Sequence, residues 1–271
     1  MALSTARISK PVYEECCRYL VCDVEPELSR GDIRMFKILL YDEFRDGIAA
    51  SNMLGNADPD IFIKGASKLS TEDDHEKIID LISINKLRFP GWFEQFYQKM
   101  RDNWNYIDPA SADADEVRER WLNLNAFTAR LTLHLPDDEI IRFGMYTLSD
   151  ALAQKKWLRR DRFFRTWYDE DPDAANGHIP AAAQWILLAG EYLYMSKFTT
   201  TPGMPTCKDY WVTWRQMFHR VEITIDEESG VEEQTRKWAI MAGEGMDAVV
   251  QKFMGPKVRW VRCEGRYHGY H

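Results

Sequence analysis

Apolar residues recur at helical spacing along most of this sequence, and this periodicity limits the chain to an α-helical fold. One example is the series Ile33, Phe36, Leu40, Phe44 and Ile48, because side chains three or four residues apart lie on the same face of a helix. No series of alternating apolar and polar residues indicates strands, and no internal repeat or long heptad pattern occurs. The sequence therefore predicts an all-α protein, built as a multi-helix array or bundle.

The segment from about residue 180 to residue 196 is the most apolar of the predicted helices. It begins with Pro180, a residue favoured in the first turn of a helix, and apolar side chains cover nearly its whole circumference. Such a helix is usually buried, so we expect helix 180–196 to be the centre of the array. Further helices are predicted from residue 29, after residue 70, and at about residues 91–104, 115–135, 137–156, 208–221 and 230–254.

Clusters of turn-forming residues indicate how the chain is organised. We predict a single helical domain over residues 1–271, with a sub-boundary near residues 108–114, where an Asp-Pro dipeptide begins a short polar stretch. Residues 169–177 and 199–205 are rich in Pro, Gly, Asp and Thr and are predicted as surface loops. Residues 256–271 form a basic and aromatic C-terminal tail, which either packs onto the body or stays loose.

Composition and charge exclude several classes of function. A formal net charge of -8 and a pI near 5.4 argue against nucleic-acid binding, which needs a positive surface. No stretch reaches the roughly 20 apolar residues that cross a bilayer, so no membrane span is expected. The N-terminus shows no export signal, and the five cysteines form no C-x-x-C pair. We therefore expect a cytoplasmic protein with reduced thiols and without a metal site.

Two polar residues interrupt the apolar helix 180–196. Gln184 and Glu191 are seven residues apart, so both lie on the same face of a helix. A buried carboxylate must pair with a cation, accept hydrogen bonds or keep its proton, because water no longer solvates its charge. Glu191 is therefore either a paired structural acid, which is the more frequent case, or a catalytic acid.

Candidate partners for this acid lie on other predicted helices. Trp211, Arg215 and His219 share one helix face, and arginine can bind a carboxylate with two hydrogen bonds, while histidine exchanges a proton near neutral pH. For any one residue, satisfying a group between helices or filling the core is the simpler interpretation. The candidate catalytic residues are Glu191 and His219, and the candidate substrate-binding residues are Asn125, Arg130, Gln184, Trp185, Tyr194, Trp211 and Arg215.

The chain contains none of the short motifs that mark dinucleotide, nucleotide-phosphate, zinc-protease or serine-hydrolase sites, so no cofactor is predicted. Acidic clusters occur at residues 73–76 and 137–139. An all-helical protein with acidic clusters is similar in outline to magnesium-dependent terpene cyclases. Both clusters, however, lie at predicted helix starts, where acidic side chains interact favourably with the helix dipole without a metal.

Three segments in the C-terminal two thirds of the chain carry a family resemblance. They are WLNLNAFTARL at residues 121–131, PAAAQW with AGE and a tyrosine within residues 180–194, and W-x-x-W-R-x-x-F at residues 211–218. In this order they resemble a fungal family of uncharacterised helical proteins, the domain of unknown function DUF3632. The chain carries Ser149 where that family usually carries an arginine. The resemblance implies a fungal source and a helical cytoplasmic protein, but no reaction or catalytic residue.

We predict a cofactor-independent small-molecule enzyme of fungal specialised metabolism, a cyclase, pericyclase or isomerase, with a hydrophobic substrate in an aromatic-lined pocket. In this scheme Glu191 or His219 transfers a proton, and Arg130 or Arg215 binds an anionic or carbonyl group. The alternative is a non-catalytic helical ligand-binding or scaffold protein whose buried polar residues specify helix packing. A magnesium-dependent terpene cyclase is a weaker alternative.

Overall fold

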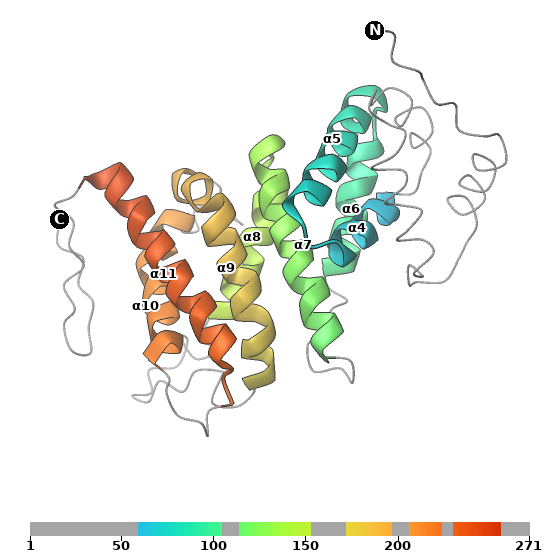
Figure 1. The fold of residues 1–271 in the computed structure, drawn as a ribbon. Coiled ribbons are helices and arrows are strands. Elements are labelled where there is room, and N and C mark those ends of the chain that lie inside the picture. Colours follow the sequence, from blue (N-terminus) through green and yellow to red (C-terminus); the bar gives the residue numbers. More distant parts are fainter. Residues whose placement is uncertain (1–58, 105–113, 153–171, 197–205, 224–229, 256–271) are drawn as a thin grey trace, which may run out of the picture. The chain divides into compact units, whose positions relative to one another are not determined.

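Every regular element in the described part of the chain is an α-helix. The structure, a computed structural model, describes residues 59–104, 114–152, 172–196, 206–223 and 230–255 (Figure 1). Within these ranges there are eight helices and no strand, which confirms the predicted all-α class. The helix predicted from residue 29, the loop at 199–205 and the tail at 256–271 lie outside the described residues.

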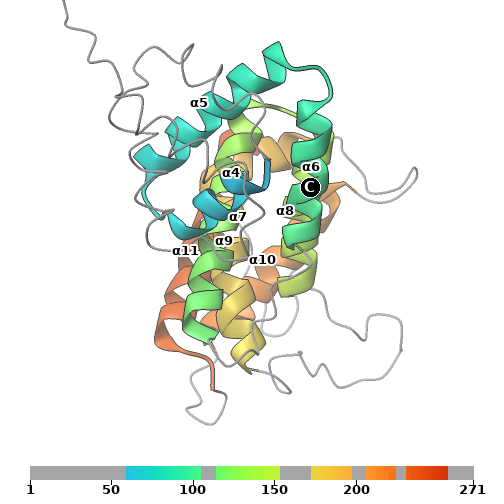
Figure 2. The same cartoon turned by 90° about the vertical axis from the view of Figure 1, so that its right-hand side faces the viewer.

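The helices are labelled as in Figure 1, and Figure 2 shows them from the side. Their bounds are α4 Pro59–Lys68, α5 Glu72–Arg88, α6 Trp92–Trp104, α7 Ala114–His134, α8 Asp138–Leu152, α9 Pro172–Met195, α10 Cys207–Ile223 and α11 Glu233–Met254.

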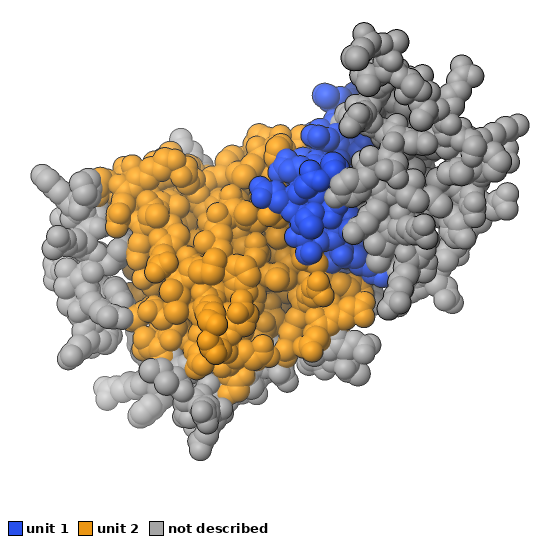
Figure 3. Space-filling view, in the orientation of Figure 1, with its two compact units in different colours: residues 1–107 blue, residues 108–271 orange. Residues whose placement is uncertain are grey.

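Spatial contacts divide the chain into two compact units, residues 1–107 and residues 108–271 (Figure 3). The described helices of unit 1 are α4, α5 and α6, and those of unit 2 are α7 to α11. The single domain over residues 1–271, with its sub-boundary near 108–114, stays a prediction.

In unit 1, a local sequence signal begins α5, and aromatic side chains pack α4 against α6. Thr71 is the N-cap of α5, where its Oγ1 accepts a hydrogen bond of 3.1 Å from the Asp74 backbone N–H. Phe62 of α4 meets Trp92 of α6 edge-on, with ring centroids 5.5 Å apart, and Trp92 stacks on Phe96 at 5.6 Å. Buried aromatic contacts therefore join α4 to α6.

In unit 2, α9 packs against α7, α8, α10 and α11 (Figure 1). The approach of α8 to α9 requires Gly144, because a Cβ atom at this position would lie 2.6 Å from Cε3 of Trp185. A similar approach joins α10 to α11 at Gly243, where a Cβ atom would lie 2.9 Å from Nη1 of Arg215. Two glycines thus allow large side chains to lie directly against neighbouring helix backbones.

The start of α9 corrects the prediction made from the sequence. The helix begins at Pro172, so residues 172–177 are helical rather than part of a loop, and Pro180 lies inside the helix. Proline at an interior position removes one backbone hydrogen bond. The turns of α9 before Pro180 are stabilised by tertiary contacts instead, because Asn176 forms hydrogen bonds with residues at the beginning of α11. Long-range contacts therefore override the local turn signals of this segment.

The central position of helix 180–196 is not confirmed, because α9 is not buried all round. Leu187, Glu191 and Met195, spaced four residues apart, are exposed along one side. Ala189 has a φ of -123° and a ψ of 15°, so the helix is kinked between the first and second of these residues. Trp185 and Leu193 are fully buried on other sides. None of the described helices has the apolar run that crossing a bilayer requires.

Gly144→Ala tests the close packing of α8 on α9. Alanine favours a helix over glycine by about 1 kcal/mol, but its Cβ would overlap the rigid indole of Trp185. We expect a net loss of about 1–3 kcal/mol in the free energy of unfolding, measured by urea denaturation.

Gly245→Ala in α11 is the matched control. A Cβ atom there would lie 3.4 Å from the end of the Leu187 side chain, an ordinary van der Waals distance. This variant should be as stable as the wild type or more stable by up to about 1 kcal/mol. An equal loss of stability in both variants would contradict the packing described for Gly144.

Candidate functional site

Asn125 of α7 is the centre of a buried hydrogen-bond network that joins three helices. Its Oδ1 accepts hydrogen bonds of 2.8 Å from Thr147 Oγ1 of α8 and of 2.8 Å from Trp185 Nε1 of α9. Its Nδ2 donates to the backbone carbonyl of Trp121 at 2.9 Å. Asn125, Thr147 and Trp185 are all fully buried. The structure therefore brings together Asn125 and Trp185, two predicted substrate-binding residues, and their polar groups bond to each other.

The interior of α7 and α8 contains further buried hydroxyl groups that the sequence analysis missed. Thr128 and Thr132 donate to the backbone carbonyls four residues earlier, at 2.7 Å and 2.9 Å. Thr147, the third of these threonines, donates to Asn125 instead. Buried hydroxyl groups are normally paired in this way, because an unpaired one is costly. In the sequence, these threonines could have been recognised only as polar residues at positions where the helical pattern predicts apolar ones.

Glu191 lies on the surface, so the expectation of a buried carboxylate was wrong. Both of its carboxylate oxygens accept hydrogen bonds from Lys252 Nζ of α11, at 2.6 Å and 2.5 Å. The side chains of Glu191 and Lys252 are 54% and 59% exposed. In a helix that is apolar on nearly every side, the stripe with the carboxylate is the one that turns to water, because this avoids the desolvation of a charge.

Arg215 and His219 of α10 also have partners that were not among the predicted site residues. Arg215 binds Asp247 of α11 with two hydrogen bonds, Nε to Oδ1 at 3.0 Å and Nη2 to Oδ2 at 2.9 Å. His219 Nδ1 lies 2.8 Å from Oε2 of Glu222 on the same helix. The first pair fastens α10 to α11, and planar bidentate geometry of this kind is the strongest form of such a contact.

Tyr194 and Trp211 come together where α9, α10 and α11 meet. Their ring centroids are 5.1 Å apart at an interplanar angle of 71°, and both residues are buried. Trp211 Nε1 donates to the Met246 carbonyl at 3.3 Å, and the Tyr194 hydroxyl donates to Met254 Sδ at 3.3 Å. Burial raises the pKa of the Tyr194 phenol. Lys208 Nζ lies 5.4 Å from the centre of the Tyr194 ring, within cation–π distance.

Of the nine predicted residues, four form two pairs within the set and three bind residues outside it. Asn125 meets Trp185, and Tyr194 meets Trp211, whereas Glu191, Arg215 and His219 have partners outside the set. Arg130 on α7 and Gln184 on α9 are half-buried. The partners outside the predicted set are Lys252, Asp247 and Glu222.

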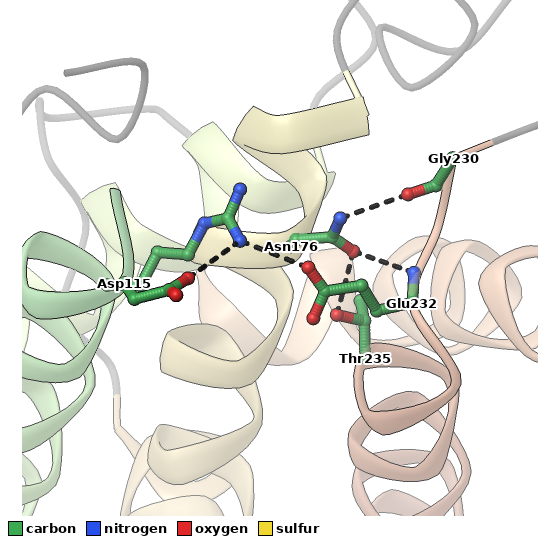
Figure 4. A network of polar contacts seen from close by, with 6 residues as sticks. Asp115, Asn176, Gly230, Glu232 and Thr235 are labelled. Carbon is green, nitrogen blue, oxygen red and sulfur yellow. Dashed lines mark hydrogen bonds and ion pairs between the residues drawn. The ribbon is translucent and has the colours of Figure 1, made fainter. Parts of the chain in front are cut away.

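A second network at the beginning of α11 was also missed (Figure 4). Asn176 Oδ1 accepts hydrogen bonds from the Glu232 backbone N–H at 3.0 Å and from Thr235 Oγ1 at 2.9 Å, and its Nδ2 donates to the Gly230 carbonyl at 3.0 Å. The N-cap residue Glu232 makes no capping bond with its own side chain, and it binds Arg118 of α7 at 3.0 Å instead. Asn176 thus acts as a cap from another helix.

The acidic clusters have structural roles in the helices that they begin. Asp73 pairs with Lys77 at 2.7 Å, and Asp137 Oδ1 accepts a hydrogen bond of 2.9 Å from the Glu139 backbone N–H. Among the described residues, no group of three or more His, Cys, Asp or Glu side chains is arranged to hold a metal ion. The thiol of Cys207 is buried, and burial raises its pKa to about 12, so it is a poor nucleophile near neutral pH.

Asn125→Leu tests whether the first network holds the helices together. Leucine has a similar volume but leaves the Trp185 N–H and the Thr147 hydroxyl without an acceptor. We expect a loss of about 2–4 kcal/mol in the free energy of unfolding, because each unpaired buried group costs about 1–3 kcal/mol. Thr147→Val is the control. It keeps the hydrogen bond between Trp185 and Asn125, so the free energy of unfolding should fall by only about 1 kcal/mol. Unchanged stability of Asn125→Leu would contradict a structural role.

Glu191→Gln tests the surface position of this residue. An exposed ion pair contributes about 0–1 kcal/mol, so the substitution should change the free energy of unfolding by no more than that. Lys252→Gln should have an equally small effect, and high salt should remove the difference. A loss above about 2 kcal/mol would show that Glu191 is a buried, paired acid.

Comparison with known proteins identifies the family of the chain. A search of curated proteins and a search of solved structures each found no similar protein. The sequence profile of the family described as Protein of unknown function (DUF3632) matches residues 60–218. This match extends from α4 into α10 and covers more than half of the chain, including Asn125, Asn176 and Trp185. The chain therefore belongs to the DUF3632 family.

Proposed function

We propose that this protein is a non-catalytic helical binding or scaffold protein, and that its buried polar residues specify how the helices pack. The observation that carries the proposal is the Asn125 network, in which the buried polar groups of three helices bond to one another. A buried amide that serves three protein partners has little capacity left for a substrate. Fully satisfied networks of this kind favour one arrangement of helices over others.

The position of Glu191, one of the two predicted proton-transfer residues, supports the same proposal. Its side chain is half-exposed to water and held by Lys252. General acid–base catalysis needs a group placed within hydrogen-bond reach of a substrate and shielded from water. An ion-paired surface carboxylate meets the second requirement poorly.

The binding surface proposed here is the α9–α11 face, defined by the exposed side chains of Leu187 in α9 and Met241 in α11. Leu187 lies against Gly245, which is one helical turn from Met241. Of the ten large apolar side chains that are exposed in the described part of the chain, six belong to α9 or α11. Apolar groups that remain in contact with water favour association with a hydrophobic ligand or partner, and flexible methionines adapt to different shapes. The six residues are Leu187, Met195, Ile240, Met241, Phe253 and Met254.

The enzyme interpretation makes different residues essential. A cyclase, pericyclase or isomerase of specialised metabolism would depend on Glu191 or His219, whereas a binding protein would depend on the α9–α11 face. The cytoplasmic location and the fungal source belong to both interpretations and stay predictions. One experiment can therefore separate the two functions by comparing two pairs of substitutions.

The test is complementation of a gene deletion in the source organism, with metabolite extracts and growth phenotype as readouts. One variant carries Glu191→Gln with His219→Ala, and the other carries Leu187→Gln with Met241→Gln, which makes the α9–α11 face polar. Circular dichroism of each purified variant controls for folding. We expect the first variant to restore the wild-type phenotype and the second to fail.

The opposite result would overturn the proposal. If the variant with Glu191→Gln and His219→Ala fails to restore a metabolite that the variant with the polar face restores, the protein is an enzyme. The compound that accumulates would then identify its substrate.

A further inference from the structure

Sulfur-containing residues in the described part of the chain differ strongly in their exposed fraction. The thiol of Cys207 is fully buried, and its pKa of about 12 leaves almost no thiolate at neutral pH. Three methionines are exposed instead: Met195, Met241 and Met254 have exposed fractions of 58%, 45% and 45%. A thioether needs no deprotonation before it is oxidised, so these methionines are accessible targets for peroxide within the described residues.

Met254 differs from the other two exposed methionines because its sulfur accepts a hydrogen bond. The Tyr194 hydroxyl of α9 donates a hydrogen bond to Met254 Sδ of α11 at 3.3 Å. Within the described residues, the sulfur atoms of Met195 and Met241 accept no such bond. Met254 is therefore both accessible and aligned with a donor.

The donor is held in place by aromatic packing. Tyr194 is only 5% exposed, and its ring lies 5.1 Å from Trp211 and 5.8 Å from Phe253, measured between ring centroids. The pKa of its phenol is raised by burial, so the hydroxyl keeps its proton across the physiological pH range. A fixed hydroxyl beside an accessible sulfur can bind an oxygen atom that is added to that sulfur.

We propose that Met254 is a site of reversible oxidation by hydrogen peroxide, and that the Tyr194 hydroxyl binds the sulfoxide product. A sulfur lone pair attacks one peroxide oxygen, a new S–O bond forms, and the O–O bond breaks. The second oxygen leaves as water after proton transfer from the first, so the thioether becomes a sulfoxide and the peroxide becomes water. Sulfur loses two electrons and the peroxide gains them.

The position of Met254 explains why oxidation is compatible with the fold. A sulfoxide disrupts a packed core because it places a polar oxygen among apolar groups. At the end of α11, however, the Met254 residue is 45% exposed, and its sulfur accepts a hydrogen bond from Tyr194. The sulfoxide oxygen is a better acceptor than the thioether sulfur, so the bond to Tyr194 is kept and strengthened.

The experiment treats the full-length folded protein with hydrogen peroxide and locates added oxygen by peptide mass mapping. Met195→Leu and Met241→Leu are introduced first, so that Met254 is the exposed methionine left in the described part. We expect Met254 to gain one oxygen before the buried methionines, and methionine sulfoxide reductases to remove it. The buried methionines that serve as internal controls are Met100, Met145, Met217 and Met246.

Tyr194→Phe in the same background tests the bound sulfoxide. Without the hydroxyl, oxidation of Met254 should lower the Tm by about 2 °C more than it does in the presence of Tyr194. The proposal is overturned if Met254 is oxidised no sooner than the buried methionines, or if oxidation lowers the Tm equally with and without the hydroxyl.

A second comparison decides the question if Tyr194→Phe does not fold. Met254→Gln places a carbonyl acceptor near Tyr194, as the sulfoxide does, whereas Met254→Leu offers no acceptor. With Tyr194 present, the glutamine variant should have a Tm equal to or above that of the leucine variant. A lower Tm for the glutamine variant would overturn the role of Tyr194.

Discussion

The hydrogen bonds at Asn125 are the interaction on which the packing of unit 2 depends. The side chain of Asn125 is excluded from water, so the indole of Trp185 and the hydroxyl of Thr147 have one shared acceptor. If either donor lost this acceptor, its unpaired burial would cost about 1–3 kcal/mol. Apolar side chains tolerate small rotations of a helix, but these bonds do not, and they set the rotation of α9 relative to α7 and α8.

The position of α9 determines which of its side chains are exposed to water. With Trp185 directed toward α8, the opposite stripe of α9, which carries Leu187 and Glu191, is exposed. α11 is then held beside α9 by Asn176 at one end, and it is joined to α10 by the bidentate contact of Arg215 with Asp247. Exposed apolar side chains then remain on α9 and α11, while the buried polar groups of Asn125, Thr147 and Trp185 are bonded to one another.

The fold class could be predicted from the sequence, because helical periodicity is repeated along most of the chain. Individual starts such as that of α5 also have local signals, since Thr71 caps the helix next to it. The candidate site depended on information that is not local. The periodicity of a helix that is apolar on nearly every side does not determine which stripe faces water, so Glu191 was misplaced. Asp247 and Asn176 are far along the chain from the residues that they bind, and no local spacing indicates those contacts.

The most direct test of this account is the rate of hydrogen exchange at the indole N–H of Trp185, followed by NMR in the native protein and assigned with Trp185→Phe. If the bond to Asn125 holds the helices together, this hydrogen exchanges only through global unfolding, and its rate falls as the free energy of unfolding rises. Rapid exchange under conditions where the rest of α9 is protected would contradict the account, because it would show that water reaches Asn125 in the native state.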